Sequence, residues 1–372
     1  MNIKMVAPCL LGTEGIVANE LKRMDAENVA PENGRVFFSG DFNILARANI
    51  CSRYSERILI LMGSFKATSF EELFQGVKSL PWEQWIGKTD CFPVKGSSLN
   101  SKLASIPDCQ KIIKKAVVER LKETYKISWF EETGENYQIQ FLILKDNVQV
   151  MIDTTGQGLH KRGYRAVATE APIKETLAAV MCDLSHVMSN HTVVDPCCGS
   201  GTILIEAALK ALNIAPGLHR SFTSEFWSNI PNKVWDDEFQ RAKDAVKTDC
   251  DFHGYGYDID ENAIELAKEN ARKAGVFNKI TFEQRNIRDY TNIFERCSVI
   301  CNPPYGERLL DIEQAQDLYK IMGEKFDKRQ GHSYTIISPD EDFEYLFGRK
   351  ADKRRKLYNG MIKCQVYMYF KN

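Results

Sequence analysis

The sequence lacks the features of a membrane-spanning, secreted or zinc-binding protein. No uninterrupted apolar run in its 372 residues approaches the ~20 residues needed to cross a bilayer. The first residues do not lead into the hydrophobic segment of a signal peptide. The 11 cysteines are odd in number and scattered, and no Cys-x-x-Cys pair occurs. Free thiols in a reducing compartment are therefore expected, so we predict a cytoplasmic protein without a bound metal.

An excess of charge of either sign is also missing. The chain has 49 Lys and Arg against 50 Asp and Glu, a formal net charge of −1. Because the protein as a whole does not attract polyanions, any nucleic acid must bind to local basic patches. Hydrophobic residues make up 44% of the chain and charged residues 27%, as in ordinary globular proteins. The length predicts two or three domains.

Residues 1–65 predict a small α/β domain. Apolar residues recur at helical spacing over 15–24, and strand signals cover 34–38 and 57–62. We expect a sandwich of the ferredoxin-like type.

Residues 66–155 predict a second α/β region with a basic helix. Ser69 and Glu72 have capping-box spacing and should begin a helix. The other expected elements are a short strand at 91–94, a helix over 107–125, and two strands within 137–150 joined by a turn at Asp146-Asn147. Residues 88–126 hold nine Lys or Arg against four Asp or Glu. A solvated helix face is one interpretation; the other is contact with nucleic-acid phosphates through Lys111, Lys114 and Lys115.

Residues 156–170 predict a basic connector punctuated by glycine. Its candidate nucleic-acid contacts are His160, Lys161, Arg162, Tyr164 and Arg165. A surface linker is the simpler interpretation. The functional one is a segment that lies between a nucleic-acid-binding domain and an active site.

Residues 171–372 alternate strand and helix, which predicts a doubly wound parallel sheet. The expected strands are 192–195, 254–257, 280–284, 298–301 and 334–337, and the expected helices are 174–182, 202–212, 261–274 and 312–326. A long, loop-rich insertion carries Trp227 and Trp235, and its role is left open. Asn359-Gly360 between two β-prone runs predicts a closing antiparallel hairpin.

A glycine-containing segment, Asp195-Pro196-Cys197-Cys198-Gly199-Ser200-Gly201-Thr202, lies between a predicted strand and a predicted helix. Gly199 and Gly201 let a ligand approach the backbone, and the helix start offers unpaired N–H groups. The third glycine of the dinucleotide fingerprint is missing, because position 204 is Leu, and no Gly-Lys-Ser/Thr follows. The segment therefore predicts a ligand other than a pyrophosphate.

Polar residues follow the next two predicted strands. The Asp258 carboxylate can accept both hydroxyls of a ribose, whereas Asp260 is expected to cap the following helix. Asn286 is open to two interpretations, a hydrogen bond to an adenine edge or ordinary turn chemistry.

Asn302-Pro303-Pro304-Tyr305 ends a short apolar strand. The Asn302 amide oxygen and the Pro303 carbonyl can each accept one hydrogen of an exocyclic amine, and Tyr305 offers a flat face for stacking. This combination indicates chemistry on the amino group of a nucleobase. The plainer interpretation is a turn that ends a strand with a buried Tyr.

Taken in chain order, these segments resemble class I S-adenosylmethionine-dependent methyltransferases that methylate amino groups. The whole chain resembles the THUMP-domain RNA guanine-N2 methyltransferases, in particular the bacterial 23S ribosomal RNA enzymes. The more family-specific match is Asp-x-x-Gly-x-x-Leu-His-Lys-Arg-Gly-Tyr-Arg at 153–165. Two positions depart from the family pattern: Cys197, where a bulkier apolar residue is frequent, and Asn286, where Asp is common.

The resemblance implies a Rossmann-like methyltransferase domain at 171–372, a THUMP RNA-binding domain at 66–155, and S-adenosyl-L-methionine as cofactor, with S-adenosyl-L-homocysteine as product. The implied cofactor-binding residues are Asp195, Cys197, Gly199, Gly201, Thr202, Asp258, Ile259, Asn286, Ile287 and Asn302. The implied catalytic residues are Asn302, Pro303, Pro304 and Tyr305. The expected partner is RNA, either ribosomal RNA or a precursor particle.

Other functions stay open on the sequence alone. The same chemistry could act on a transfer RNA guanine or on an adenine N6 amine. A non-catalytic RNA-binding or ribosome assembly factor could retain the fold. A nicotinamide dehydrogenase is disfavoured by the incomplete glycine fingerprint. The modified nucleotide and the oligomeric state are not determined.

Overall fold

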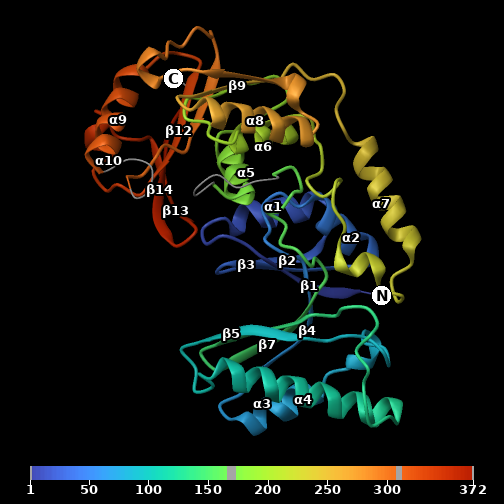
Figure 1. The fold of residues 1–372 in the computed structure, drawn as a ribbon. Coiled ribbons are helices and arrows are strands. Elements are labelled where there is room, and N and C mark those ends of the chain that lie inside the picture. The colour runs from blue at the N-terminus through green and yellow to red at the C-terminus, as the bar shows by residue number, and fades with distance from the viewer. Residues whose placement is uncertain (1, 166–172, 307–311, 371–372) are drawn as a thin grey trace.

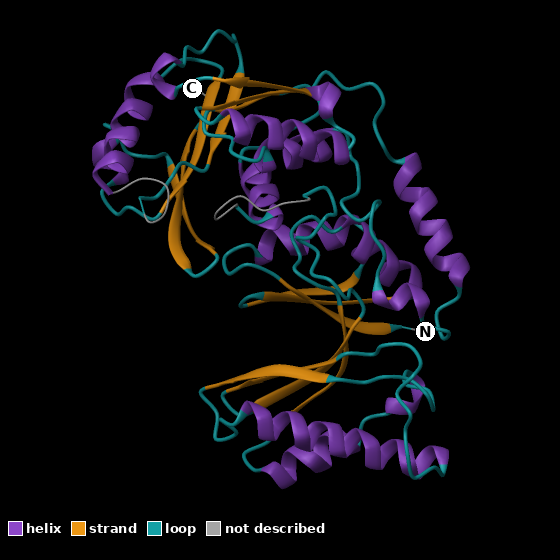
Figure 2. Cartoon of the chain, viewed as in Figure 1, coloured by secondary structure: helices purple, strands orange, loops and turns teal. Residues whose placement is uncertain are grey.

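The protein contains two seven-stranded sheets with helices packed against them (Figures 1 and 2). The computed structural model describes residues 2–165, 173–306 and 312–370. The expected start of the C-terminal domain at residue 171 lies outside these ranges. No helix within them is both long enough and apolar enough to span a membrane.

The first sheet, with strand order β2-β3-β1-β4-β7-β6-β5, is shared by the two N-terminal regions. Its strands are β1 (Ile3–Pro8), β2 (Glu27–Glu32), β3 (Arg35–Gly40), β4 (Leu59–Lys66), β5 (Val94–Leu99), β6 (Ile139–Leu144) and β7 (Asn147–Asp153). β4 pairs with β1 on one side and with β7 on the other. A single sheet therefore crosses the expected boundary between residues 65 and 66.

Helices lie at both ends of this N-terminal half. They are α1 (Glu14–Arg23), α2 (Phe42–Cys51), α3 (Phe70–Lys78) and α4 (Ile106–Tyr125). α1 and α2 face the C-terminal domain, whereas α3 and α4 lie at the far end of the molecule (Figure 1). α3 begins where the sequence predicts, because the Ser69 hydroxyl accepts a hydrogen bond from the Glu72 N–H at 3.2 Å.

Two local predictions in this half are wrong in detail, and the elements β1, β2 and α2 were not predicted from the sequence. The strand expected at 91–94 begins only at Val94, because Pro93 cannot donate to a ladder. The hairpin turn uses Lys145 and Asp146, whose φ angles are +51° and +63°, instead of Asp146-Asn147. β2 was not predicted, because its side chains are almost all exposed and show no apolar alternation.

The second sheet has the order β10-β9-β8-β11-β12-β14-β13. Its strands are β8 (Thr192–Asp195), β9 (His253–Asp258), β10 (Ile280–Gln284), β11 (Cys297–Cys301), β12 (His332–Ser338), β13 (Lys353–Asn359) and β14 (Ile362–Tyr369). Its helices are α5 (Glu175–Leu184), α6 (Thr202–Ala211), α8 (Glu261–Lys273), α9 (Ile312–Lys325) and α10 (Phe343–Leu346). β8 to β12 are parallel, and β14 is antiparallel to both β12 and β13. The predicted α/β sheet with a closing hairpin is confirmed, although the turn residues are Gly360 and Met361.

The tryptophan-bearing insertion contains a helix, α7 (Asn232–Asp244), so the expectation of a loop-rich segment is wrong. α7 packs against α2, and Arg47 pairs with Glu238 at 2.8 Å (Figure 1). The Trp227 ring stacks on Tyr137 with centroids 4.2 Å apart, and Trp235 stacks on Phe222. Trp227 and the Arg47–Glu238 pair thus join the insertion to the N-terminal half, whereas Trp235 packs within the insertion itself.

Candidate active site

The predicted site residues gather at one edge of the second sheet. Asp195, Asp258 and Cys301 are the last residues of β8, β9 and β11. These strands are parallel neighbours in the order β9-β8-β11. Their carboxyl ends therefore meet at the same edge, which is where open α/β sheets bind ligands.

The loop between β8 and α6 has the backbone that its glycines predict. Gly199 and Gly201 have φ angles of +50° and +78°, which side chains rarely adopt. A Cβ added at Gly201 would lie 3.0 Å from the Ala267 Cβ, so this glycine is required for packing. A Cβ at Gly199 would meet no atom within 4 Å. The loop therefore presents open backbone at Gly199, as a cofactor-binding loop must.

Asp258 faces this loop directly. Its Oδ2 accepts a hydrogen bond from the Gly199 N–H at 2.8 Å, and its Oδ1 accepts one from the Asp260 N–H at 3.1 Å. Asp260 caps α8 by accepting from the Asn262 N–H at 2.9 Å, as predicted. Ile259 between them is 64% exposed. A carboxylate and an apolar side chain thus stand together beside the glycine loop.

Asn286 serves the turn that follows β10. Its Oδ1 accepts from the Arg288 N–H at 2.9 Å, which is the turn chemistry considered as its alternative role. Ile287 next to it is buried. Its amide NH2 and the second lone pair of its oxygen remain for any contact with a ligand.

Buried acid and thiol groups join the glycine loop to the end of β11. The Asp195 carboxylate accepts from the Cys197 N–H at 3.2 Å and from the Cys301 thiol. Burial, with a smaller contribution from the negative charge of Asp258, raises the pKa of Asp195 to about 8. Burial likewise raises the pKa of the Cys301 thiol. Because Cys301 immediately precedes Asn302, these contacts hold the candidate catalytic segment beside the loop.

The candidate catalytic segment is held by its own tyrosine. The Tyr305 hydroxyl donates to Oδ1 of Asn302 at 2.5 Å and accepts from Nδ2 of Asn359 at 3.2 Å. The Tyr319 hydroxyl donates to the Pro304 carbonyl at 3.3 Å. Burial raises the pKa of Tyr305, so its hydroxyl stays a donor. Asn359 was treated only as a turn residue, since nothing local in the sequence indicates that the hairpin reaches Tyr305.

Some of the candidate RNA-binding residues are exposed, and others are engaged in contacts within the protein. Lys111 and Lys115 on α4 and Lys161 in the connector are exposed. The Lys114 ammonium lies 2.6 Å from Glu132 and 3.5 Å from the centre of the Phe92 ring. Lys114 is therefore engaged within its own domain.

The rest of the connector is mostly internal, which corrects part of the prediction. Arg162 and Tyr164 are buried and both contact Glu206 of α6, at 3.4 and 3.1 Å. Arg165 donates to Thr202 Oγ1 at 2.6 Å and pairs with Glu175. His160 lies 3.4 Å from the Glu56 carboxylate. Because Arg162 and Tyr164 are buried, they join the two halves of the protein and have no exposed surface for RNA.

A doubly wound sheet with an open glycine loop and an acidic neighbouring strand end defines a class I methyltransferase. Comparison with known proteins agrees. Residues 162–368 match the family described as "RMKL-like, methyltransferase domain", residues 4–59 match "RlmL ferredoxin-like domain", and residues 67–153 match "THUMP domain".

Similar proteins cover nearly all of the chain. The Bacillus subtilis (strain 168) protein named "Putative RNA methyltransferase YpsC" is 42% identical over 98% of this chain and 95% of its own length. The "Ribosomal RNA large subunit methyltransferase K/L" of Shewanella pealeana is 32% identical over 96% of this chain. This chain spans about half, 51%, of that relative.

Three solved structures superpose over the whole chain. A "possible methylase" of Clostridium difficile 630 has a TM-score of 0.96 at 43% identity and is covered to 99%. A "predicted N6-adenine-specific DNA methylase" of Listeria monocytogenes has 0.94 at 44%, covered to 97%. "SMU.472, a putative methyltransferase complexed with SAH" has 0.94 at 40%, covered to 98%.

The chain belongs to the RMKL-like methyltransferase family. It is an RNA methyltransferase with a THUMP domain, and S-adenosyl-L-methionine is its cofactor.

Proposed function

We propose that this enzyme methylates the exocyclic N2 amine of a guanine in 23S ribosomal RNA. The proposal rests on the position of Asn302 and Pro303, which lie directly after β11 and beside the glycine loop. The K/L relatives, named for the large ribosomal subunit, support the choice of RNA.

The proposed cofactor site uses the open backbone at Gly199 and the Asp258 carboxylate. Asp258 would accept the ribose hydroxyls, and the exposed Ile259 would cover an adenine face. Of the remaining predicted residues, Cys197, Asn286 and Asn302 are at least partly exposed and would contact the cofactor. Asp195, Gly201, Thr202 and Ile287 are buried and would support the loop and strand ends around it. When bound, S-adenosyl-L-methionine supplies an electrophilic methyl group.

The proposed role of Asn302 and Pro303 is to orient a poor nucleophile. The lone pair of a guanine amine is delocalised into the ring, so the amine reacts only if its nitrogen becomes pyramidal. The Asn302 amide oxygen and the Pro303 carbonyl would each accept one amine hydrogen. An amide oxygen has two lone pairs, so Asn302 can accept from Tyr305 and from the base together. Positioning of this kind supplies much of the acceleration.

Tyr305 would hold the flipped base and keep the Asn302 amide in orientation. The product cation loses a proton readily, so no general base is required before transfer. On the RNA side, Lys111, Lys115 and Lys161 would contact backbone phosphates.

Transfer of labelled methyl groups from S-adenosyl-L-methionine to ribosomal RNA tests the proposal. Asn302→Ala should reduce transfer by at least about 100-fold, which is the typical effect of removing one group that stabilises a transition state. Cofactor affinity should stay within about twofold of the wild-type value. Unchanged turnover would exclude the assigned role.

Methylation of an adenine N6 amine is the second candidate, because the similar Listeria protein is named a predicted N6-adenine-specific DNA methylase. The Asn302 amide oxygen and the Pro303 carbonyl could accept the amine hydrogens of either guanine or adenine. Mass analysis of nucleosides from cells with and without the protein separates N2-methylguanosine from N6-methyladenosine, and purified ribosomal and transfer RNA fractions separate the two RNA classes.

A further inference from the structure

The C-terminal hairpin carries a concentration of positive charge that the candidate site does not use. Residues 349–363 contain seven Lys or Arg and a single Asp, in a chain whose net charge is −1. The four consecutive cations Lys353 to Lys356 lie on β13, the last strand of the sheet. Because neighbouring strand residues point to opposite faces, these cations lie on both faces of the edge strand. Lys353, Arg354 and Lys356 are exposed, whereas the Arg355 guanidinium donates to the Gly12 carbonyl at 3.2 Å, so the N-terminal half lies against β13 at that point.

The two ends of β13 lie at the candidate active site and beside a pocket. Its last residue, Asn359, donates to the Tyr305 hydroxyl and so lies at the candidate active site. Its first residue, Lys353, comes directly after Asp352, which lines a pocket at the opposite end of the strands, near the start of β12. Seven residues at about 3.3 Å each span roughly 20 Å between these points.

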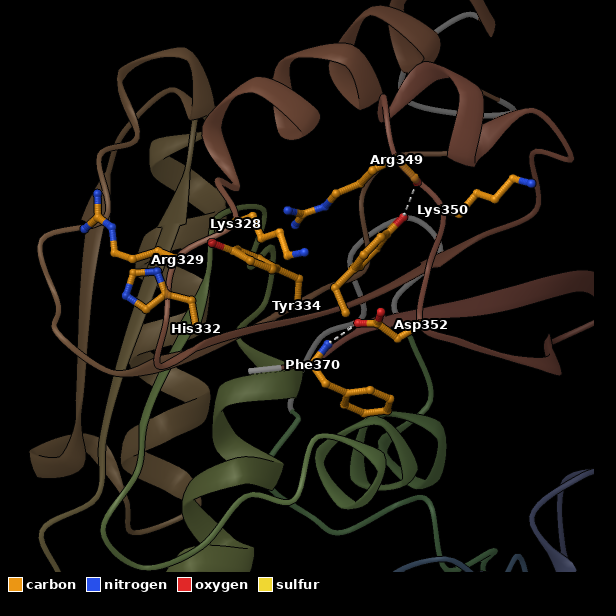
Figure 3. Close-up of a pocket in the computed structure, with 9 residues that line it drawn as sticks. Lys328, Arg329, His332, Tyr334, Arg349, Lys350, Asp352 and Phe370 are labelled. Atoms are coloured by element: carbon orange, nitrogen blue, oxygen red, sulfur yellow. Dashed lines mark hydrogen bonds between the residues drawn. The ribbon is translucent and has the colours of Figure 1, made fainter. Parts of the chain in front are cut away.

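The pocket has a volume of about 170 Å³, and cations and aromatic rings dominate its lining, which also includes Asp352 and His332. The Asp352 carboxylate accepts a hydrogen bond from the Phe370 N–H at 2.8 Å. The ends of the Lys328 and Arg349 side chains point into the same space above Tyr334, whereas Arg329 and Lys350 point outward (Figure 3). The Arg349 guanidinium lies 4.7 Å from the centre of the Tyr369 ring and 5.2 Å from that of Tyr334. Two converging cations repel each other unless an anion lies between them.

Few of these cations have acidic partners within the described ranges. Arg354 lies 3.4 Å from Glu344, Lys363 lies 3.6 Å from Glu341, and Arg329 pairs with Asp327 at 3.1 Å. No carboxylate of the described residues pairs with Lys328, Arg349, Lys350, Lys353 or Lys356. Within the same part of the chain, the buried Nε and Nη2 atoms of Arg349 have no hydrogen-bond partner. A buried donor without a partner is destabilising, so a phosphate oxygen that enters the pocket would stabilise these groups.

We propose that β13 and the Lys328–Arg349 pocket form a second RNA-binding surface, along which backbone phosphates run toward Asn302. Phosphates match unpaired lysines and arginines, and contacts to them fix the register of RNA without reading its sequence. α4 of the THUMP region lies at the other end of the molecule (Figure 1), so RNA would be held on both sides of the active site. The inference needs an RNA substrate, but it does not depend on which base is methylated.

A matched pair of double variants tests the β13 part. Lys353→Gln/Lys356→Gln removes two exposed charges from the edge, and Lys243→Gln/Lys247→Gln removes two exposed charges at and just after the end of α7. The affinity for a labelled single-stranded RNA of mixed sequence is measured by fluorescence anisotropy at several KCl concentrations. This readout requires no methyl transfer, so its outcome is independent of the guanine assignment.

The β13 variant should bind RNA about tenfold more weakly at 0.1 M salt. The slope of log affinity against log salt should become shallower by about 1.4, since each single-strand phosphate contact contributes about 0.7. The α7 control should match the wild type, and all three proteins should bind S-adenosyl-L-methionine equally in calorimetry. Equal RNA affinities and slopes for the two variants would overturn the proposal.

Two further outcomes bear on the alternatives. Lysines on edge strands also prevent strand-to-strand aggregation. Aggregation of the β13 variant in light scattering, with RNA affinity unchanged in its monomeric fraction, would assign the charges to that role. Lys328→Gln alone should weaken RNA binding about threefold, and an unaltered affinity would exclude the pocket from the surface.

Discussion

The Tyr305 hydroxyl donates a 2.5 Å hydrogen bond to Oδ1 of Asn302, the oxygen proposed to accept an amine hydrogen from the substrate. Asn359 of the C-terminal hairpin in turn donates to the Tyr305 hydroxyl at 3.2 Å. The orientation of the candidate catalytic amide therefore depends on a residue three positions later and on a strand end more than fifty residues away.

Tyr305→Phe should lower kcat about fivefold with little change in cofactor affinity. The ring is retained, but the amide loses a hydrogen bond of about 1 kcal/mol that holds its orientation. Single-turnover methyl transfer at saturating substrate measures the effect. Tyr345→Phe is the control, because Tyr345 is 86% exposed and remote from Asn302 in sequence. A kcat equal to that of the control would contradict the positioning role.

Gly199→Ala should weaken S-adenosyl-L-methionine binding at least tenfold while the protein stays folded. The added methyl group meets no protein atom within 4 Å, and the proposed site places the cofactor in this open space. Gly275→Ala is a matched control, with a φ of +73° and equally open surroundings at the end of α8. Both variants should lose about 1 kcal/mol of stability from backbone strain. Calorimetric titration and thermal unfolding measure the two effects, and equal cofactor affinities would remove the glycine loop from the binding site.

Asp258→Asn should also reduce cofactor affinity, by about tenfold or more, because charge-assisted hydrogen bonds are roughly twice as strong as neutral ones. Asp260→Asn removes the same charge two residues away and retains an effective helix cap. It should bind the cofactor as the wild type does. Similar losses in both variants would show that general electrostatics, and not a ribose contact, is responsible.

Arg162→Met should destabilise the protein by about 3 to 5 kcal/mol, because it leaves the buried Glu206 carboxylate without its charged partner. Chemical denaturation measures the loss, and Lys161→Gln, on an exposed neighbour, should change stability by less than about 0.5 kcal/mol. RNA affinity per folded molecule should be unaltered in Arg162→Met. Stable folding with lost RNA binding would restore the direct RNA contact that the sequence predicts.

Glu56 should make stability depend on pH in the acid range. Although burial opposes it, the His160 imidazole 3.4 Å away, a hydrogen bond from Thr176 and the charge of Lys174 lower the pKa of Glu56 to about 2. The folded pKa lies below the unfolded value, so the stabilisation is complete above about pH 4.5 and is lost as pH falls toward 2. Its size is about 3 kcal/mol.

The measurement is the difference in unfolding free energy between the wild type and Glu56→Gln across pH 2 to 6. Asp195, whose pKa is raised to about 8, makes stability depend on pH in the opposite direction. Because it is present in both proteins, its contribution cancels in the difference. The difference should shrink as the pH falls. A constant difference would contradict the assigned pairing.

Elements whose cause is local were predictable from the sequence. The Ser69 cap, the α8 cap at Asp260, and the alternation of strands and helices after residue 173 all depend on residues within a few positions of each other. The polar strand ends Asp195, Asp258 and Asn302 were found for the same reason, since the end of a buried strand is visible in the apolar pattern. The exposed strand β2 is missed because apolar periodicity is absent there, whereas β1 and α2 are missed although they are largely buried.

The connector and the hairpin show where local pattern fails. Arg162 and Tyr164 look like solvent-facing, basic linker residues in the sequence, yet they are buried against Glu206. Their burial depends on how two distant parts of the chain pack. The cationic run at 353–356 was visible in the sequence, but its direction toward Tyr305 was not.

The amino-acid sequence by itself determined the class of chemistry, because the residue types at the strand ends decide which atoms can accept an amine hydrogen or bind a ribose. The tertiary structure alone decided which charged side chains meet solvent and which are buried between domains. Exposure depends on contacts between residues more than forty positions apart, such as Arg162 with Glu206. No local pattern records such contacts, since they form only when whole elements pack together.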